Sequence, residues 1–242
     1  MIEALVWGGV SASSLLIGAI VVLSWNWSPR IVGLAMGFGA GALISAVSFE
    51  LVEEAFDAAS GSGVVAIGLA AGALTFFGGD WWIDRRGGAD RKDVSGKPSG
   101  GNAGAIMLGT VLDGIPESIV IGGSLATGGV SAAMVVAAFL SNFPEALGAS
   151  SGLITTGTPR RKLMLMWAGI VAVSAVSSGI GFRVLEAAAP ETGAFFQCFA
   201  AGAVLTMLVD SMIPEANDEG GPLAGLFTVL GFAIAVWISK IE

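Results

Sequence analysis

Residues 4–23 of this chain read ALVWGGVSASSLLIGAIVVL and contain no charged side chain. A helix needs about 20 apolar residues to cross the ~30 Å hydrocarbon core of a bilayer, so this stretch is long enough to span a membrane. Seven further predominantly apolar stretches of sufficient length follow, at residues 31–56, 63–83, 104–127, 130–155, 163–188, 193–215 and 222–240. The sequence therefore predicts an all-α polytopic membrane protein, with a single domain over residues 1–242 and eight transmembrane helices.

The composition supports this class and excludes several others. Hydrophobic residues make up 54% of the chain and charged residues 12%, too few charges to cover a soluble surface. The net charge of −8, without a basic patch, argues against nucleic-acid binding. The chain has no histidine and a single cysteine, Cys198, so histidine-based triads and His/Cys zinc sites lack their essential residue. We therefore expect no enzyme and no cofactor, and any ion chemistry must use oxygen ligands.

The basic residues predict the orientation in the membrane. Nine of the eleven Lys and Arg residues follow the first, third and fifth spans, and they are Arg30, Arg85, Arg86, Arg91, Lys92, Lys97, Arg160, Arg161 and Lys162. Because Lys and Arg accumulate in cytoplasmic loops, we expect both termini to be extracytoplasmic, with Arg183 and Lys240 as exceptions. The segment 84–103, rich in glycine and mixed charge, is predicted to be a flexible cytoplasmic loop.

Two internal similarities relate spans from opposite halves of the chain. Residues 38–55 resemble residues 199–216, a match that chance explains about equally well. Residues 112–118 (LDGIPES) resemble residues 140–146 (LSNFPEA), and the shared Pro-Glu pair makes chance a poor explanation. Pairing the second span with the seventh and the fourth with the fifth is a mirror order. That order predicts an inverted internal repeat, an arrangement in which transporters often place the binding site where the repeats meet.

The repeated Pro-Glu motifs place acidic residues within two predicted spans. Asp113 and Glu117 lie one helical turn apart on the fourth span, and Ser141 and Glu145 have the same spacing on the fifth. The proline before each glutamate leaves the carbonyl four residues earlier without its helical N–H partner. An acidic residue at the bilayer centre costs roughly 2.5–3.5 kcal/mol, and neither span contains Lys or Arg. Either a bound cation offsets this cost, or the acids stay protonated and join helices by hydrogen bonds.

Further acidic residues occur on the second and seventh spans. One acidic stripe near the outer end of the second span is formed by Glu50, Glu53, Glu54 and Asp57, which follow i, i+3, i+4, i+7 spacing. This stripe is either a cation entrance or a hydrated helix end. Asp210 and Glu215 lie on the seventh span, and the Asp-x-x-x-Pro-Glu context of Asp210 favours a place along an ion pathway.

The two motifs resemble those of the ZIP (Zrt/Irt-like) family of divalent metal transporters, whose fourth and fifth helices carry a Pro-Glu pair preceded by histidine. Here the corresponding segments read DGIPES at residues 113–118 and SNFPEA at residues 141–146. The resemblance implies a metal site formed by Asp113, Glu117, Ser141, Asn142 and Glu145. Ser177 or Ser178 occupies the position of a sixth-helix glutamate that serves a second metal in the family, which implies that any second site is weakened or lost.

What the resemblance implies is a homodimeric importer of divalent cations such as Zn²⁺, Mn²⁺ or Fe²⁺ in the inner cell membrane. The ion would be a transported substrate bound at mid-membrane and moved by alternating access, with spans 1, 4, 5 and 6 sliding against the others. Without imidazole, the ligands favour hard ions relative to Zn²⁺. Two other functions remain open: a proton-coupled carrier of another substrate, and a membrane metal sensor that does not transport.

Overall fold

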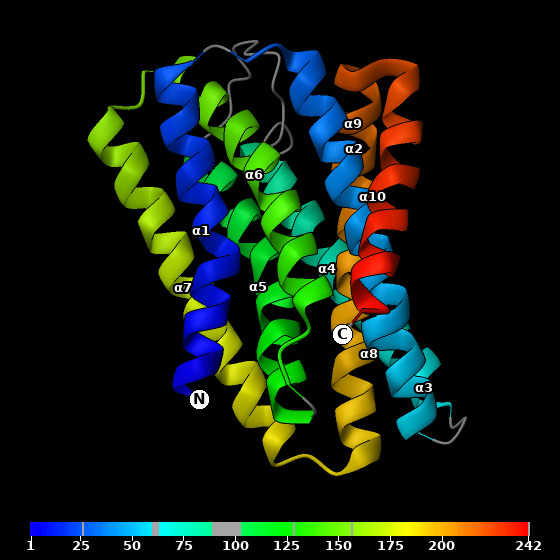
Figure 1. Cartoon of the computed structure of the whole chain (residues 1–242). Helices are drawn as coiled ribbons and strands as arrows, with labels where there is room; N and C mark the ends of the chain where they lie inside the picture. The colour runs from blue at the N-terminus through cyan, green and yellow to red at the C-terminus, as the bar shows by residue number, and fades with distance from the viewer. Residues whose placement is uncertain (26, 60–62, 89–102, 128, 156, 242) are drawn as a thin grey trace.

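The computed structural model describes residues 1–25, 27–59, 63–88, 103–127, 129–155 and 157–241, and this part of the chain contains helices but no strand (Figure 1). Its α-helices are α1 (Ile2–Ser24), α2 (Pro29–Ala46), α3 (Glu54–Ala58), α4 (Val64–Ile83), α5 (Ala103–Thr127), α6 (Ala132–Thr155), α7 (Arg160–Glu186), α8 (Pro190–Met207), α9 (Ile213–Gly220) and α10 (Ala224–Ser239). Short helical segments of other pitch join some of them: the π-helical η1 (Val47–Glu53), η2 (Asp84–Gly88) and η3 (Leu208–Met212), and the 3₁₀ segment η4 (Gly221–Leu223).

Seven helical stretches in the described residues are long and apolar enough to cross a membrane, the last of them running from Pro190 to Ser239. Large apolar side chains such as Leu74, Leu226 and Val229 are exposed on the outside of the bundle. A soluble monomer rarely exposes an apolar surface this extensive, whereas lipid solvates it. The prediction of an all-α, multi-pass membrane protein is therefore confirmed.

The helices pack in two groups that meet along a shared core. Helices α1, α5, α6 and α7 contact one another in one group, and α2, α4, α8 and α10 form close pairs in the other. Some of these pairs approach to backbone contact: Gly72 of α4 lies against the Phe199 carbonyl of α8, and Gly181 of α7 lies against the Ile119 carbonyl of α5. A side chain at either glycine has no room. The two groups touch mainly where α2 meets α6 and where α5 meets α8.

Two π-helical segments interrupt the second and seventh predicted spans at matching positions. The segment η1 begins at Val47 and η3 begins at Leu208, two residues that are equivalent when residues 38–55 are aligned with 199–216. The helices that carry them run in opposite directions through the bundle (Figure 1). Single-turn π segments within α-helices are uncommon and occur often at functional sites. Their shared position supports a repeat relationship between these two parts of the chain.

The long helical stretch from Pro190 reverses direction at Gly221. This residue has a φ of 65°, a backbone conformation that glycine adopts at little cost. After it, α10 runs back beside α2 and ends in the lower half of the view in Figure 1. Without this reversal, a helix of this length would extend far beyond a ~30 Å hydrocarbon core.

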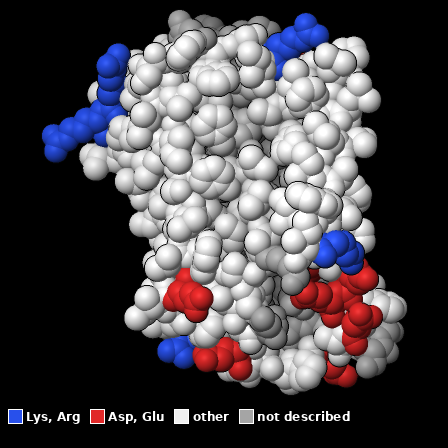
Figure 2. Space-filling model, viewed as in Figure 1, with Lys and Arg blue, Asp and Glu red and all other residues white. Residues whose placement is uncertain are grey.

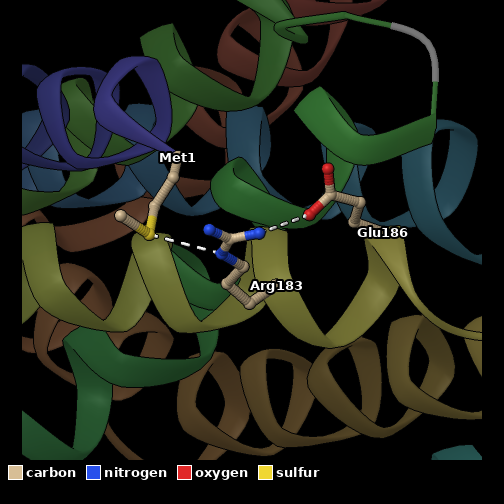
Figure 3. A network of polar contacts seen from close by, with 3 residues as sticks. All are labelled: Met1, Arg183 and Glu186. Atoms are coloured by element: carbon tan, nitrogen blue, oxygen red, sulfur yellow. Dashed lines mark hydrogen bonds and ion pairs between the residues drawn. The ribbon is translucent and has the colours of Figure 1, made fainter.

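Charged side chains gather at the two ends of the bundle and leave the visible middle uncharged (Figure 2). Basic residues dominate one end, and acidic residues dominate the other. Arg183 lies at the acidic end, where its Nη1 is 3.0 Å from Glu186 Oε2 and its Nε donates to Met1 Sδ at 3.3 Å (Figure 3). Because Glu186 neutralises Arg183 locally, this arginine is a weak exception to the distribution of positive charge.

The segment predicted as a loop after the third span begins as helix. Asp84–Gly88 form η2, and α5 is already helical at Ala103, so only residues 89–102 of the predicted loop lie outside the described residues. Within this helical end, Arg85 stacks on Trp81 at 3.7 Å and Arg86 on Trp82 at 3.8 Å from ring centre to guanidinium carbon. Such aromatic and basic pairs are suited to the interface between lipid and water.

Candidate functional site

The first Pro-Glu motif lies in the middle of α5. Asp113 and Glu117 are both buried, with 2% and 3% of their surfaces exposed, and α5 continues as helix through Pro116. Because Pro116 has no N–H, it cannot bond to the carbonyl of Leu112 one turn earlier. The motif thus places two carboxylates inside the bundle, beside a helical turn that lacks one backbone hydrogen bond.

The second motif has the same position in α6. Ser141, Asn142 and Glu145 are buried, and Pro144 lies inside the helix. The Ser141 hydroxyl donates to the carbonyl of Ala138 at 3.0 Å. A hydroxyl that donates its hydrogen still has oxygen lone pairs, so Ser141 remains a possible oxygen ligand.

Two neighbouring helices hold α6 closely around this motif. A Cβ placed on Gly18 of α1 would lie 2.7 Å from the Phe143 carbonyl oxygen, and one on Gly39 of α2 would lie 2.7 Å from the Ser141 Cα. The same Cβ on Gly39 would lie 3.1 Å from the carbonyl oxygen of Leu140, the residue one turn before Pro144. The motif of α6 is therefore enclosed by backbone of both helix groups.

The buried carboxylates of the two motifs do not form a metal site on their own. Helices α5 and α6 contact each other, and one carboxylate oxygen each of Glu117 and Glu145 is inaccessible to solvent. Within the described ranges, however, no three Cys, Asp or Glu side chains are grouped closely enough to hold one metal ion. Any ion bound here must also use the hydroxyl, amide or carbonyl oxygens, or a different arrangement of the two helices. The five-residue ligand set stays a prediction.

The predicted pathway residues occupy different surroundings. Glu50, in η1, and Glu54, in α3, line a cavity of about 480 Å³ near one end of the bundle. Asp210 is exposed in η3, whereas Glu215 in α9 is half-buried and has one enclosed carboxylate oxygen.

The two serines expected at the second metal position lie on α7. Ser177 is buried, and the Ser178 hydroxyl donates to the carbonyl of Ala4 on α1 at 2.8 Å. This bond gives Ser178 a structural role between α1 and α7. A place for either serine on the ion pathway stays a prediction.

Sequence reasoning missed Gln197, which lines the same cavity as Glu50 and Glu54. It is the only glutamine in the chain and is 8% exposed. Its place within an apolar span was a signal, since a polar amide there needs a partner or a function. Because its neighbours in the sequence are apolar, the segment resembles an ordinary membrane span.

Comparison with known proteins agrees with the motif resemblance. No family model matches the chain. The chain is 28% identical to the zinc transporter ZupT of Escherichia coli O7:K1, over 94% of both chains. It is 26% identical to the zinc transporter ZupT of Enterobacter sp. strain 638, again over 94% of both. These relatives confirm the predicted resemblance to the ZIP family.

Proposed function

We propose that this chain is a membrane transporter that imports divalent metal cations through the buried Pro-Glu motifs of α5 and α6. The observation that carries the proposal is the burial of Asp113, Glu117 and Glu145 in two helices without Lys or Arg. A bound divalent cation compensates these negative charges. Because the cation undergoes no chemical change, we assign the activity as transport, with the metal as its substrate. The names of the similar zinc transporters support the same activity.

The proposed topology has eight crossings with both termini outside the cytoplasm. The reversal at Gly221 divides the stretch Pro190–Ser239 into two antiparallel parts, which supports an eighth crossing by α10. An even number of crossings brings both termini to one side. The basic end of the bundle in Figure 2 lies opposite the N-terminus of α1 in Figure 1, as expected if basic loops face the cytoplasm. The proposed location is the inner cell membrane.

Alternating access would occur by movement between the two helix groups. The backbone contacts at Gly72 and Gly181 lie within the groups, which supports each group moving as a unit. The cavity at Glu50 would be the outer entrance, because η1 lies toward the end of the bundle that carries the N-terminus. A homodimer is also proposed, on the family resemblance alone.

The proposed ions are Zn²⁺, Mn²⁺ and Fe²⁺. Zinc follows from the names of the relatives. Hard ions follow from the ligands, because carboxylate, hydroxyl and amide oxygens favour Mn²⁺ relative to a site containing imidazole.

Uptake into proteoliposomes tests this function against its alternatives. Purified full-length protein is reconstituted, and entry of Zn²⁺ and Mn²⁺ is followed with a trapped metal-sensitive dye, with and without an imposed proton gradient. Saturable entry that needs the protein is expected. A sensor would bind metal without uptake, and a carrier of another substrate would move protons with no response to metal; either result contradicts the proposal.

A further inference from the structure

The cavity that Glu50 and Glu54 line is a built polar site near the outer end of the bundle. It has a volume of about 480 Å³ and lies between η1, the end of α5, the start of α6, and α8. Val120 and Met134 line its wall, together with Gln197. Glu117 lies only about one helical turn from Val120 along α5, so the cavity ends close to the first Pro-Glu motif.

Gln197 is the feature of this cavity that points to a ligand. Its side chain is more than nine-tenths buried, lines the cavity, and makes no hydrogen bond to any residue that the structure describes. Because the residue is largely buried but its amide atoms are not sealed from the cavity, the partner that the amide needs must come from the cavity. A group that enters the cavity can satisfy it, and the amide carbonyl is an oxygen donor of the type that hard cations use.

Only two of the four acidic residues in the stripe contribute negative charge to this cavity. Glu50 and Glu54 lie one helical turn apart and both line it. The Ser239 hydroxyl donates a hydrogen bond to Glu50 Oε1 and so restrains that carboxylate. Glu53 and Asp57, by contrast, line a neighbouring cavity of about 360 Å³. Glu50 and Glu54 border that second cavity as well, together with Lys240.

We propose that Glu50, Glu54 and Gln197 form an outer binding site for a divalent cation, separate from the buried carboxylates of α5 and α6. The cation binds there between two carboxylates and one amide oxygen, and the site loads the ion before it reaches Glu117. This inference rests on the proposed transport function for its direction, but the binding site itself does not depend on transport.

Direct binding of Mn²⁺ tests the site without transport. Full-length protein in lipid nanodiscs is titrated with Mn²⁺ and free ion is measured by electron paramagnetic resonance. The background is the Glu117→Gln/Glu145→Gln double variant, which weakens the inner motifs while keeping side-chain size. We expect this variant to retain one Mn²⁺ site. Adding Glu50→Gln or Gln197→Leu should weaken that site roughly tenfold, because each removes one ligand.

Glu53→Gln is the matched control. It removes the same charge from the same stripe but from outside this cavity, so Mn²⁺ affinity should change less than about twofold. If Glu53→Gln and Glu50→Gln weaken binding equally, and Gln197→Leu has no effect, the stripe acts only as a diffuse field and the site is overturned. Loss of all Mn²⁺ binding in the folded double variant also overturns it, because the cavity then holds only water.

Uptake by a single variant of the otherwise wild-type protein tests whether the outer site lies on the transport pathway. Gln197→Leu should raise the half-saturating Mn²⁺ concentration several-fold and leave the maximal rate unchanged, since it affects loading and not the buried motifs. A lowered maximal rate with an unchanged half-saturating concentration contradicts a loading role. Absence of uptake by the wild type would defeat the transport proposal alone, and the Mn²⁺ titration would still decide the outer site.

Discussion

Gly39 of α2 lies directly against Ser141 of α6, so close that a Cβ on Gly39 would come within 2.7 Å of the Ser141 Cα. This contact joins the two helix groups beside the second Pro-Glu motif. It makes the position of Ser141 depend on a residue that has no side chain and no chemistry of its own.

Substituting Gly39→Ala should therefore disturb both packing and uptake. The added methyl forces α2 and α6 apart, which costs about 1–3 kcal/mol for overpacking of this kind, and it shifts the Ser141 backbone. Thermal unfolding in detergent and metal uptake should both decline. Gly78→Ala on α4 is the control, because a Cβ there meets nothing within 4 Å. Equal effects of the two substitutions would refute the importance of the Gly39 contact.

Asp113→His should change which metal the protein prefers. The substitution introduces the imidazole donor that the whole chain lacks, and imidazole favours Zn²⁺ over Mn²⁺. Competition between the two ions in the uptake assay should shift toward Zn²⁺ by roughly tenfold. An unchanged competition profile would count against Asp113 as a ligand.

Metal binding should weaken as the pH falls into the range where carboxylates take up protons. A divalent ion binds the ionised carboxylates of Asp113, Glu117 and Glu145, so protons compete with it and binding releases them. The sign is thus tighter binding at higher pH. Calorimetry in buffers of different ionisation enthalpy measures the released protons. Heats measured at acidic pH that do not depend on the buffer, with constant affinity down to about pH 4, would disagree with this assignment.

Trp167→Phe should destabilise the contact between α6 and α7. The indole Nε1 of the fully buried Trp167 donates to Ser150 Oγ at 2.9 Å. The phenylalanine ring has no N–H, so Ser150 loses this hydrogen bond, and the smaller ring leaves a gap in the packing. We expect a cost of about 1–3 kcal/mol. The midpoint of thermal unfolding should fall, whereas Trp237→Phe, at a residue that is 66% exposed, should change it little. A similar midpoint for both variants would show that the bond adds nothing.

Much of the fold follows from the sequence because a bilayer restricts the choices. Apolar length alone placed helices such as α1 and α6 within two residues of their observed ends, since a backbone in lipid must bond within its own helix. The motif of α5 was predicted to be buried, and Asp113 and Glu117 are. The start of η2 at Asp84 was missed, because glycine and charge there suggested a loop.

Other features depend on tertiary contacts that the pattern does not contain. The π-helical segments η1 and η3 are only seven and five residues long, and apolar periodicity is too coarse to predict such local changes in helical pitch. Gln197 becomes informative only when α8 brings it into the cavity with Glu50. The sharing of one ion by the carboxylates of α5 and α6 stays a prediction, because helix spacing fixes neighbours along one helix but not distances between helices.

The most direct test of the transport account is metal uptake by Glu117→Ala and Glu145→Ala in proteoliposomes, with membrane insertion and folding verified for each. Both variants should lose uptake, because each removes a buried carboxylate ligand that the rest of the motif cannot replace. Glu186→Ala, which removes an exposed carboxylate on α7, should transport at the wild-type rate. Wild-type uptake by both folded variants would contradict the claim that the ion passes through the Pro-Glu motifs.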